Sequence, residues 1–236
     1  MLSLDSFWSL ADDTRLETEY RVDKKLKFLQ TASRESLQSI CLQYRYFTKD
    51  FPDNLAVLLA KTPHGNFKSL IGEIVSEELG EGNPKRAHLR LYDNFLLSIG
   101  IPENLLEDSL YPNNATLLHE ISQLTLSRSK TYGIGLVGMG GECLCQIYLA
   151  NMYDNLVKNP YIQSNSKNID WEFWHFHTGE ADIIHRQKVR QAINEIVDSE
   201  PSSVNDLASG YQKAKHNWDT FWSNNYAIAM VNQAVA

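Results

Sequence analysis

Cysteine is scarce in this sequence: the 236 residues include only Cys41, Cys143 and Cys145. An odd number of cysteines without the spacing of a disulfide framework is typical of proteins from a reducing compartment. Cys143 and Cys145 lie two positions apart in a segment of helical pattern, so their side chains point roughly 200° apart around the helix. We therefore expect free thiols that do not bind one metal ion together, in a cytoplasmic protein.

Positive charge and long apolar runs are also in short supply. The chain has 29 acidic residues against 22 Lys and Arg, a formal net charge of -7. This charge repels phosphate backbones and anionic lipid headgroups, and no dense basic cluster offsets it. The first residues lack the basic flank of a signal peptide, and the apolar runs are shorter than the ~20 residues of a membrane helix. We expect no nucleic-acid partner, no membrane association and no export.

Glycine and proline are few, at 12 and 7 residues, and no segment alternates apolar and polar residues for long enough to predict a strand. With 43% apolar residues, the composition is that of a globular protein. Apolar residues recur instead at three- and four-residue steps, which predicts helices. The sequence therefore predicts an all-α fold in a single domain, residues 1–236, with helices at 33–61, 67–79, 84–99, 114–128, 138–158, 172–197 and 204–232.

A glycine-rich segment, residues 133–141, directly precedes Glu142. Residues 133–138 formally match the G-x-G-x-x-G dinucleotide pattern, but the segment before them has helical rather than strand character, so we predict no dinucleotide site. Glycine allows another helix or a ligand to approach the backbone closely. An unpaired Glu142 would be costly to bury in so apolar a segment, which favours metal binding there. We place a substrate pocket at Gly138, Gly141 and Tyr44.

Histidine and carboxylate residues cluster near the end of the chain. His175, His177 and His185 fall within eleven residues, together with Glu180 and Asp182. Asp182 and His185 lie three positions apart, so one helix face carries both side chains. Imidazoles and carboxylates without convergent thiolates suit iron or manganese better than a structural zinc site.

A second pattern lies upstream, where Glu78 precedes Gly80 and His88 follows Asn83-Pro84. A carboxylate at a helix end, a histidine in the next helix, an acidic residue in a glycine-rich helix and a late Asp-x-x-His resemble the haem-oxygenase-like diiron oxidases. This family shares its all-helical fold with the thiaminase-like and PQQ-synthase-like proteins, and the likeness is strongest to its chlamydial death-domain-associating (CADD-like) branch. The resemblance covers most of the chain and implies a haem-oxygenase-like bundle of about seven helices.

The metal ligands that the resemblance implies come from four regions of the chain, and they are Glu78, His88, Glu142, His177, Asp182 and His185. Glu81 is the alternative to Glu78. The break at Gly80 interrupts the helix, so helical periodicity cannot show which of the two carboxylates faces the metal. The family carries its first histidine four residues before the aspartate, where this chain has Thr178. A one-residue π-bulge near Thr178-Gly179 would bring His177 inward, and His175 is the alternative.

The activity that the resemblance implies is oxidation by dioxygen at two iron ions, with manganese as the alternative metal and O₂ as co-substrate. The substrate would be a small molecule with apolar surface, oxidised at a C–H or N–H bond, desaturated or fragmented. The CADD-like branch includes a protein that consumes its own tyrosine and lysine, but the lysine position holds Met152 here. We therefore expect an external substrate. The resemblance leaves two questions open: whether an external electron donor takes part, and whether the protein forms a homodimer.

Two other classes of function remain. A metal-free hydrolase of the thiaminase type would use Cys145 or Cys143 as nucleophile and a nearby carboxylate as base. A binding protein for small molecules or proteins, without catalysis, would keep the helical core and leave the ligand set incomplete.

Overall fold

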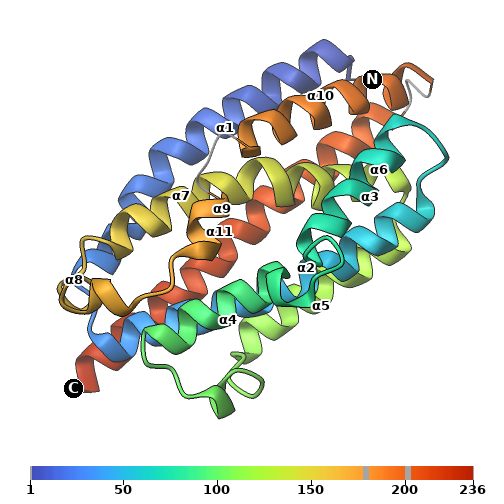
Figure 1. Cartoon of the computed structure of the whole chain (residues 1–236). Coiled ribbons are helices and arrows are strands. Elements are labelled where there is room, and N and C mark those ends of the chain that lie inside the picture. Colours follow the sequence, from blue (N-terminus) through green and yellow to red (C-terminus); the bar gives the residue numbers. More distant parts are fainter. Residues whose placement is uncertain (1, 178–180, 200–202, 236) are drawn as a thin grey trace.

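The computed structural model describes the backbone of residues 2–177, 181–199 and 203–235, and the side chains of residues 2–177, 187–197 and 203–230. The described residues are helical and contain no strand, which confirms the all-α prediction. The helices pack as an elongated bundle (Figure 1). In chain order the elements are α1 (Leu4–Leu26), η1 (Lys27–Gln30), α2 (Arg34–Lys61), α3 (Asn66–Glu78), η2 (Pro84–Arg86), α4 (His88–Ser98), η3 (Glu103–Leu105), α5 (Pro112–Ser127), α6 (Lys130–Gly133), η4 (Ile134–Leu144), α7 (Cys145–Leu156), α8 (Pro160–Asn165), η5 (Ser166–Asn168), α9 (Glu172–His177), α10 (Ala181–Ser199) and α11 (Val204–Val235).

There are more helical segments than the seven expected. The helix predicted at 172–197 is two helices, α9 and α10, and the one predicted at 84–99 begins with the short 3₁₀ turn η2. Helix α2 is continuous from Arg34 to Lys61 and contains Pro52, and the Ser33 hydroxyl accepts a hydrogen bond from the Ser36 amide at its start (3.2 Å). The predicted serine cap therefore marks the true start of α2.

Helix α1 was not predicted. Its buried face carries Thr14 and Thr18 among the apolar residues, and both are under 10% exposed. The Thr18 hydroxyl donates to the Thr14 carbonyl oxygen, so its polar group is satisfied within the helix. Threonines on the buried face weaken the apolar periodicity, which explains why the sequence pattern missed this helix.

Helix α11 occupies the middle of the bundle and packs most extensively on η4 (Figure 1). The close approach is possible because glycines on each side face the backbone of the opposite segment. A Cβ on Gly135 would lie 2.2 Å from the Leu207 carbonyl oxygen, and a Cβ on Gly210 would lie 2.1 Å from the Tyr132 carbonyl oxygen. The predicted close approach at the glycine-rich segment is thus a helix–helix contact. Residues 134–144 are π-helical, a geometry that is frequent at functional sites.

Residues Lys130–Leu156 form one helix that is long and apolar enough to cross a membrane by length and composition alone. The lengths of the uninterrupted apolar runs in the sequence did not predict such a helix. However, 72% of its apolar window is buried inside the molecule. Such burial is typical of the core helix of a soluble protein, and η4 and α11 together form one wall of the cavity that adjoins the site described next.

Candidate metal centre

Three side chains of metal-ligating type meet where α3 ends, α4 begins and α9 ends. Glu78, His88 and His177 each offer a ligand atom, and these atoms all lie within 4.8 Å of one another. Nδ1 of His88 is 3.0 Å from Oε1 of Glu78, and the rings of His88 and His177 have centroids 4.7 Å apart. The three residues are thus close enough for one ion to contact all of them.

The turn between α3 and α4 sets the positions of Glu78 and His88. Helix α3 ends at Glu78, and Gly80 follows with a left-handed φ of +83°. A Cβ on Gly80 would lie 2.3 Å from the Asn83 carbonyl oxygen and 2.5 Å from the Ala87 amide nitrogen. Only glycine fits so tight a turn. The Asn83 side chain then accepts a hydrogen bond from the Lys85 amide and starts the turn that leads to His88.

His177 is held as a neutral imidazole. Its Nδ1 lies 2.8 Å from the carbonyl oxygen of Phe173, and because a carbonyl can only accept, Nδ1 must donate. In the neutral ring Nε2 then carries the free lone pair that a metal needs. Burial, and after it the neighbouring His88, lower the pKa of His177 to about 4, although Glu78 and the Phe173 carbonyl oppose the shift. At neutral pH no proton competes with a metal for this nitrogen.

Glu142 lies in η4 and is half-buried. It lines two cavities that meet at Glu78 and His177: an inner one, and an outer one of about 240 Å³ that also reaches His88.

Asp182 and His185 fall in the first turns of α10, but their side chains lie outside the described residues, as does the bulge expected at Thr178-Gly179. Their role as ligands stays a prediction.

The two alternative ligands are not part of the three-residue cluster. Glu81 is exposed, with a left-handed φ of 53°, and lies on the rim of the outer cavity. His175 is exposed and lies beside Trp171 and Phe176, because two residues of helix turn it roughly 200° away from His177. The geometry therefore brings together Glu78 rather than Glu81, and His177 rather than His175.

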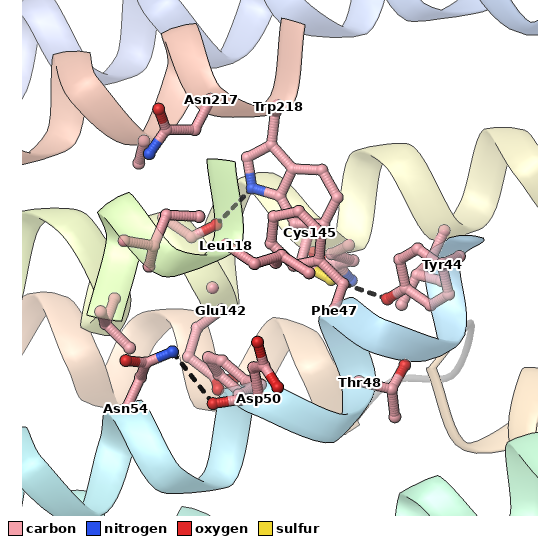
Figure 2. A pocket seen from close by; sticks show the side chains of 18 of the residues that line it. Tyr44, Phe47, Thr48, Asp50, Asn54, Leu118, Glu142, Cys145, Asn217 and Trp218 are labelled. Atoms are coloured by element: carbon pink, nitrogen blue, oxygen red, sulfur yellow. Dashed lines mark hydrogen bonds between the residues drawn. The ribbon is translucent and has the colours of Figure 1, made fainter. Parts of the chain in front are cut away.

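A cavity of about 80 Å³ extends from Glu78, Glu142 and His177 towards α11. Its walls are mainly apolar and aromatic, and Figure 2 shows Tyr44, Phe47 and Trp218 around it. Trp218 is fixed by a hydrogen bond from its Nε1 to the Gly140 carbonyl oxygen (3.0 Å). The cavity is large enough for several water molecules or a compact ligand, and the walls would exclude bulk water from it.

Of the three residues expected at the substrate pocket, Tyr44 and Gly141 line this cavity and Gly138 does not. Gly138 faces Phe67 and Leu58 instead, since the π-helical winding of η4 changes which residues share a face.

Cys145 also lines the cavity, with its Sγ 3.4 Å from the Tyr44 hydroxyl, whereas Cys143 lines a separate cavity beside Trp8. Three polar residues that line it, Thr48, Asp50 and Asn217, carry no signal in the sequence pattern.

The donor set fits the metal that the sequence predicts. One carboxylate and two imidazoles are ligands typical of iron and manganese, and no thiolate belongs to the cluster. Glu78 is only 9% exposed, and its Oε1 lies 3.0 Å from Nδ1 of His88. A carboxylate buried next to two imidazoles would be costly without a cation to offset its charge. The cluster is therefore suited to hold a divalent metal ion.

Comparison with known proteins agrees with this geometry. The profile of a family described as iron-containing redox enzymes matches residues 39–219. No curated protein matches the chain. Among solved structures, a CADD-like protein of unknown function from Nostoc punctiforme is 18% identical, with a TM-score of 0.75 and coverage of 95% of this chain and 98% of that chain.

Two further structures are similar. A domain of unknown function with a haem-oxygenase-like fold from Shewanella denitrificans is 14% identical, with a TM-score of 0.73 and coverage of 97% of this chain and 96% of that one. A TenA homologue from Pseudomonas syringae is 15% identical, with a TM-score of 0.76 and coverage of 94% and 93%. At these identities the likeness shows the fold, which confirms the predicted haem-oxygenase-like bundle. Because the family profile spans most of the chain, the protein belongs to the family of iron-containing redox enzymes.

Proposed function

We propose that this protein is an oxidase or oxygenase that uses two iron ions and dioxygen to oxidise a small molecule with apolar surface. The observation that carries the proposal is the cluster of Glu78, His88 and His177 at one end of an apolar cavity. Membership of the iron-containing redox family supports the choice of iron. Manganese is the alternative metal for the same ligands.

The second iron ion would use Glu142, Asp182 and His185. Glu142 lines the same two cavities as Glu78 and His177, which supports a shared site. Asp182 and His185 begin α10, whose amino-terminal end follows His177 after three residues. Helical proteins of this type hold two irons with carboxylate and histidine pairs on facing helices.

Residues of the chain itself would hold the metal ligands and the substrate in place. When bound, iron supplies the redox chemistry that dioxygen activation needs. The Phe173 carbonyl fixes the tautomer and orientation of His177, and the turn at Gly80 fixes Glu78 relative to His88. The walls that carry Phe47, Gly141 and Trp218 hold the substrate away from water. Where the substrate gives only two of the four electrons that O₂ takes up, an external donor would supply the others.

Metal loading tests the proposal. Purified metal-free protein, incubated with ferrous iron without oxygen and desalted, should hold about two irons per chain, as carboxylate-bridged diiron proteins do. Admission of oxygen should then produce a visible absorption band. Protein that takes up no iron and stays colourless would contradict the proposal, and one iron per chain would restrict the site to the three-residue cluster.

A second candidate is the metal-free hydrolase, which the likeness to a TenA homologue and the position of Cys145 favour. Of the two cysteines considered, only Cys145 lines the cavity with Glu78 and Glu142. Because its Sγ faces a Tyr44 hydroxyl rather than a cation, we expect slow alkylation of Cys145 by iodoacetamide at pH 7. Mass spectrometry would follow the modification, and alkylation faster than that of a free cysteine would favour the hydrolase.

A further inference from the structure

The inner cavity contains a carboxylate that no described side chain pairs with. Asp50 lies on α2, is half-buried and lines the cavity; no ion pair or side-chain hydrogen bond joins its carboxylate to another described residue. Figure 2 shows its side chain among those that line the cavity. Burial raises the pKa of Asp50, and Asp53 raises it further, while Lys49 opposes the shift. The carboxyl group of Asp50 thus lies in a largely apolar setting and forms no ion pair with a described residue.

A second group at the cavity wall also lacks a partner. Asn217 on α11 is 1% exposed, and neither its amide nitrogen nor its carbonyl oxygen has a hydrogen-bond partner among the described residues. The hydroxyl of Thr48, two residues before Asp50 on α2, likewise has no hydrogen-bond partner among the described residues. Buried amides are normally satisfied, and an unsatisfied one next to a cavity points to a ligand or an ordered water.

The charges around the cavity restrict what can enter. The described residues that line it include the carboxylates Asp50, Glu78 and Glu142 but no lysine or arginine. Iron would offset the charge of Glu78 and Glu142, which leaves Asp50 as a remaining negative charge. In the metal-free protein, a substrate carboxylate would meet three like charges and no lysine or arginine among the described lining residues. An ammonium group would find a carboxylate and aromatic side chains such as Phe47.

We propose that the inner cavity binds a protonated amine with a compact apolar body, whose ammonium group pairs with Asp50 while Asn217 supplies a further polar contact. As a statement about the substrate, this rests on the proposed function. As a statement about binding, it needs no iron, because Asp50 and Asn217 lie outside the cluster of Glu78, His88 and His177. Fatty acids and free carboxylates are excluded as ligands on the same grounds.

The test compares three probes of similar shape on the full-length, metal-free protein at physiological ionic strength. Isobutylamine, isobutanol and isobutyrate share one branched apolar body and differ in charge. Ligand-observed NMR should give a dissociation constant for isobutylamine of about 10 mM or tighter, the range for a ligand of five heavy atoms. Isobutanol should bind at least about tenfold more weakly, and isobutyrate more weakly still.

Variants assign the discrimination to named residues. Asp50→Asn should weaken isobutylamine binding relative to isobutanol, even though Glu78 and Glu142 remain in the metal-free cavity, and should raise the Tm of the ligand-free protein by about 2–4 °C, since an unpaired, desolvated charge is removed. Asp53→Asn is the matched control, because Asp53 is exposed on the same helix and does not line the cavity. It removes the same charge and should leave the preference for the amine unchanged.

Asn217→Leu gives a second, independent measurement. It should weaken amine binding and raise the Tm of the ligand-free protein, because an apolar group of the same shape replaces an unsatisfied amide. Asn225→Leu on the same helix should lower the Tm, since the Asn225 side-chain oxygen Oδ1 accepts a hydrogen bond from the Asn114 side-chain nitrogen Nδ2 (2.9 Å). A lower Tm for Asn217→Leu would mean that a structural water satisfies the amide.

The proposal is overturned if none of the probes binds, if isobutanol or isobutyrate binds as tightly as isobutylamine, or if Asp53→Asn abolishes the preference as fully as Asp50→Asn. Its failure is distinct from that of the proposed function. Iron uptake without amine discrimination would overturn only the ligand assignment, and amine binding without iron uptake would overturn only the iron oxidase.

Discussion

Gly135→Ala should lower the free energy of unfolding by about 3 kcal/mol or more, or prevent folding, because it overpacks a rigid contact. The added Cβ would lie 2.2 Å from the Leu207 carbonyl oxygen and 2.7 Å from the Tyr211 amide nitrogen. Both are backbone atoms of α11, which cannot move aside without separating α11 from η4. Urea unfolding followed by circular dichroism measures the loss.

Gly138→Ala is the matched control, three residues further along the same helical segment. Its Cβ would make only ordinary contacts, at 3.5 Å from the Phe67 ring and 3.7 Å from Leu58. Alanine should therefore be neutral there, or stabilising by up to ~1 kcal/mol, because it favours helix over glycine. Equal stability of the Gly135→Ala and wild-type proteins would show that α11 and η4 are not packed as described.

His177→Ala should remove at least one iron per chain after anaerobic ferrous loading. The substitution takes away an imidazole whose Nε2 is unprotonated and whose ring is fixed by Phe173. Loss of a group that merely orients a ligand costs about 10–100-fold in metal affinity, and loss of the ligand itself should cost more. Iron analysis after desalting gives the stoichiometry, and far-ultraviolet circular dichroism verifies that the helices remain.

His175→Ala is the control for this prediction. His175 lies on the same helix, α9, but is exposed and outside the three-residue cluster. This variant should bind as much iron as the wild type. If His175→Ala lost iron and His177→Ala kept it, the alternative ligand would be the true one and the arrangement of α9 would be wrong.

Local signals in the sequence predicted much of the fold. Ser33 before α2 and Asn83-Pro84 before η2 are capping signals that act within one turn, so the sequence alone places them. The start of α1 has such a signal too, at Ser3, but the threonines on its buried face hid the helical period. The π-helical winding of η4 could not be predicted, since packing against α11 rather than local preference determines it.

The sequence predicted which residue types form the candidate site, but not which of several neighbouring residues face it. Glu78 and Glu81 could not be separated by sequence because the left-handed turn at Gly80 breaks the helix between them. His177 was expected despite a spacing that departs from the family pattern, and the structure brings it next to His88. Asp50 and Asn217 were missed, because a polar residue on a helix face shows nothing of the cavity that other helices build around it.

The most direct test of the iron site is a crystal structure of the iron-loaded protein with anomalous scattering measured at the iron absorption edge. We predict one anomalous peak within coordination distance of Glu78, His88 and His177, and a second one beside Glu142. An iron-loaded crystal with no peak at Glu78, His88 and His177, or with its iron bound elsewhere, would contradict the account.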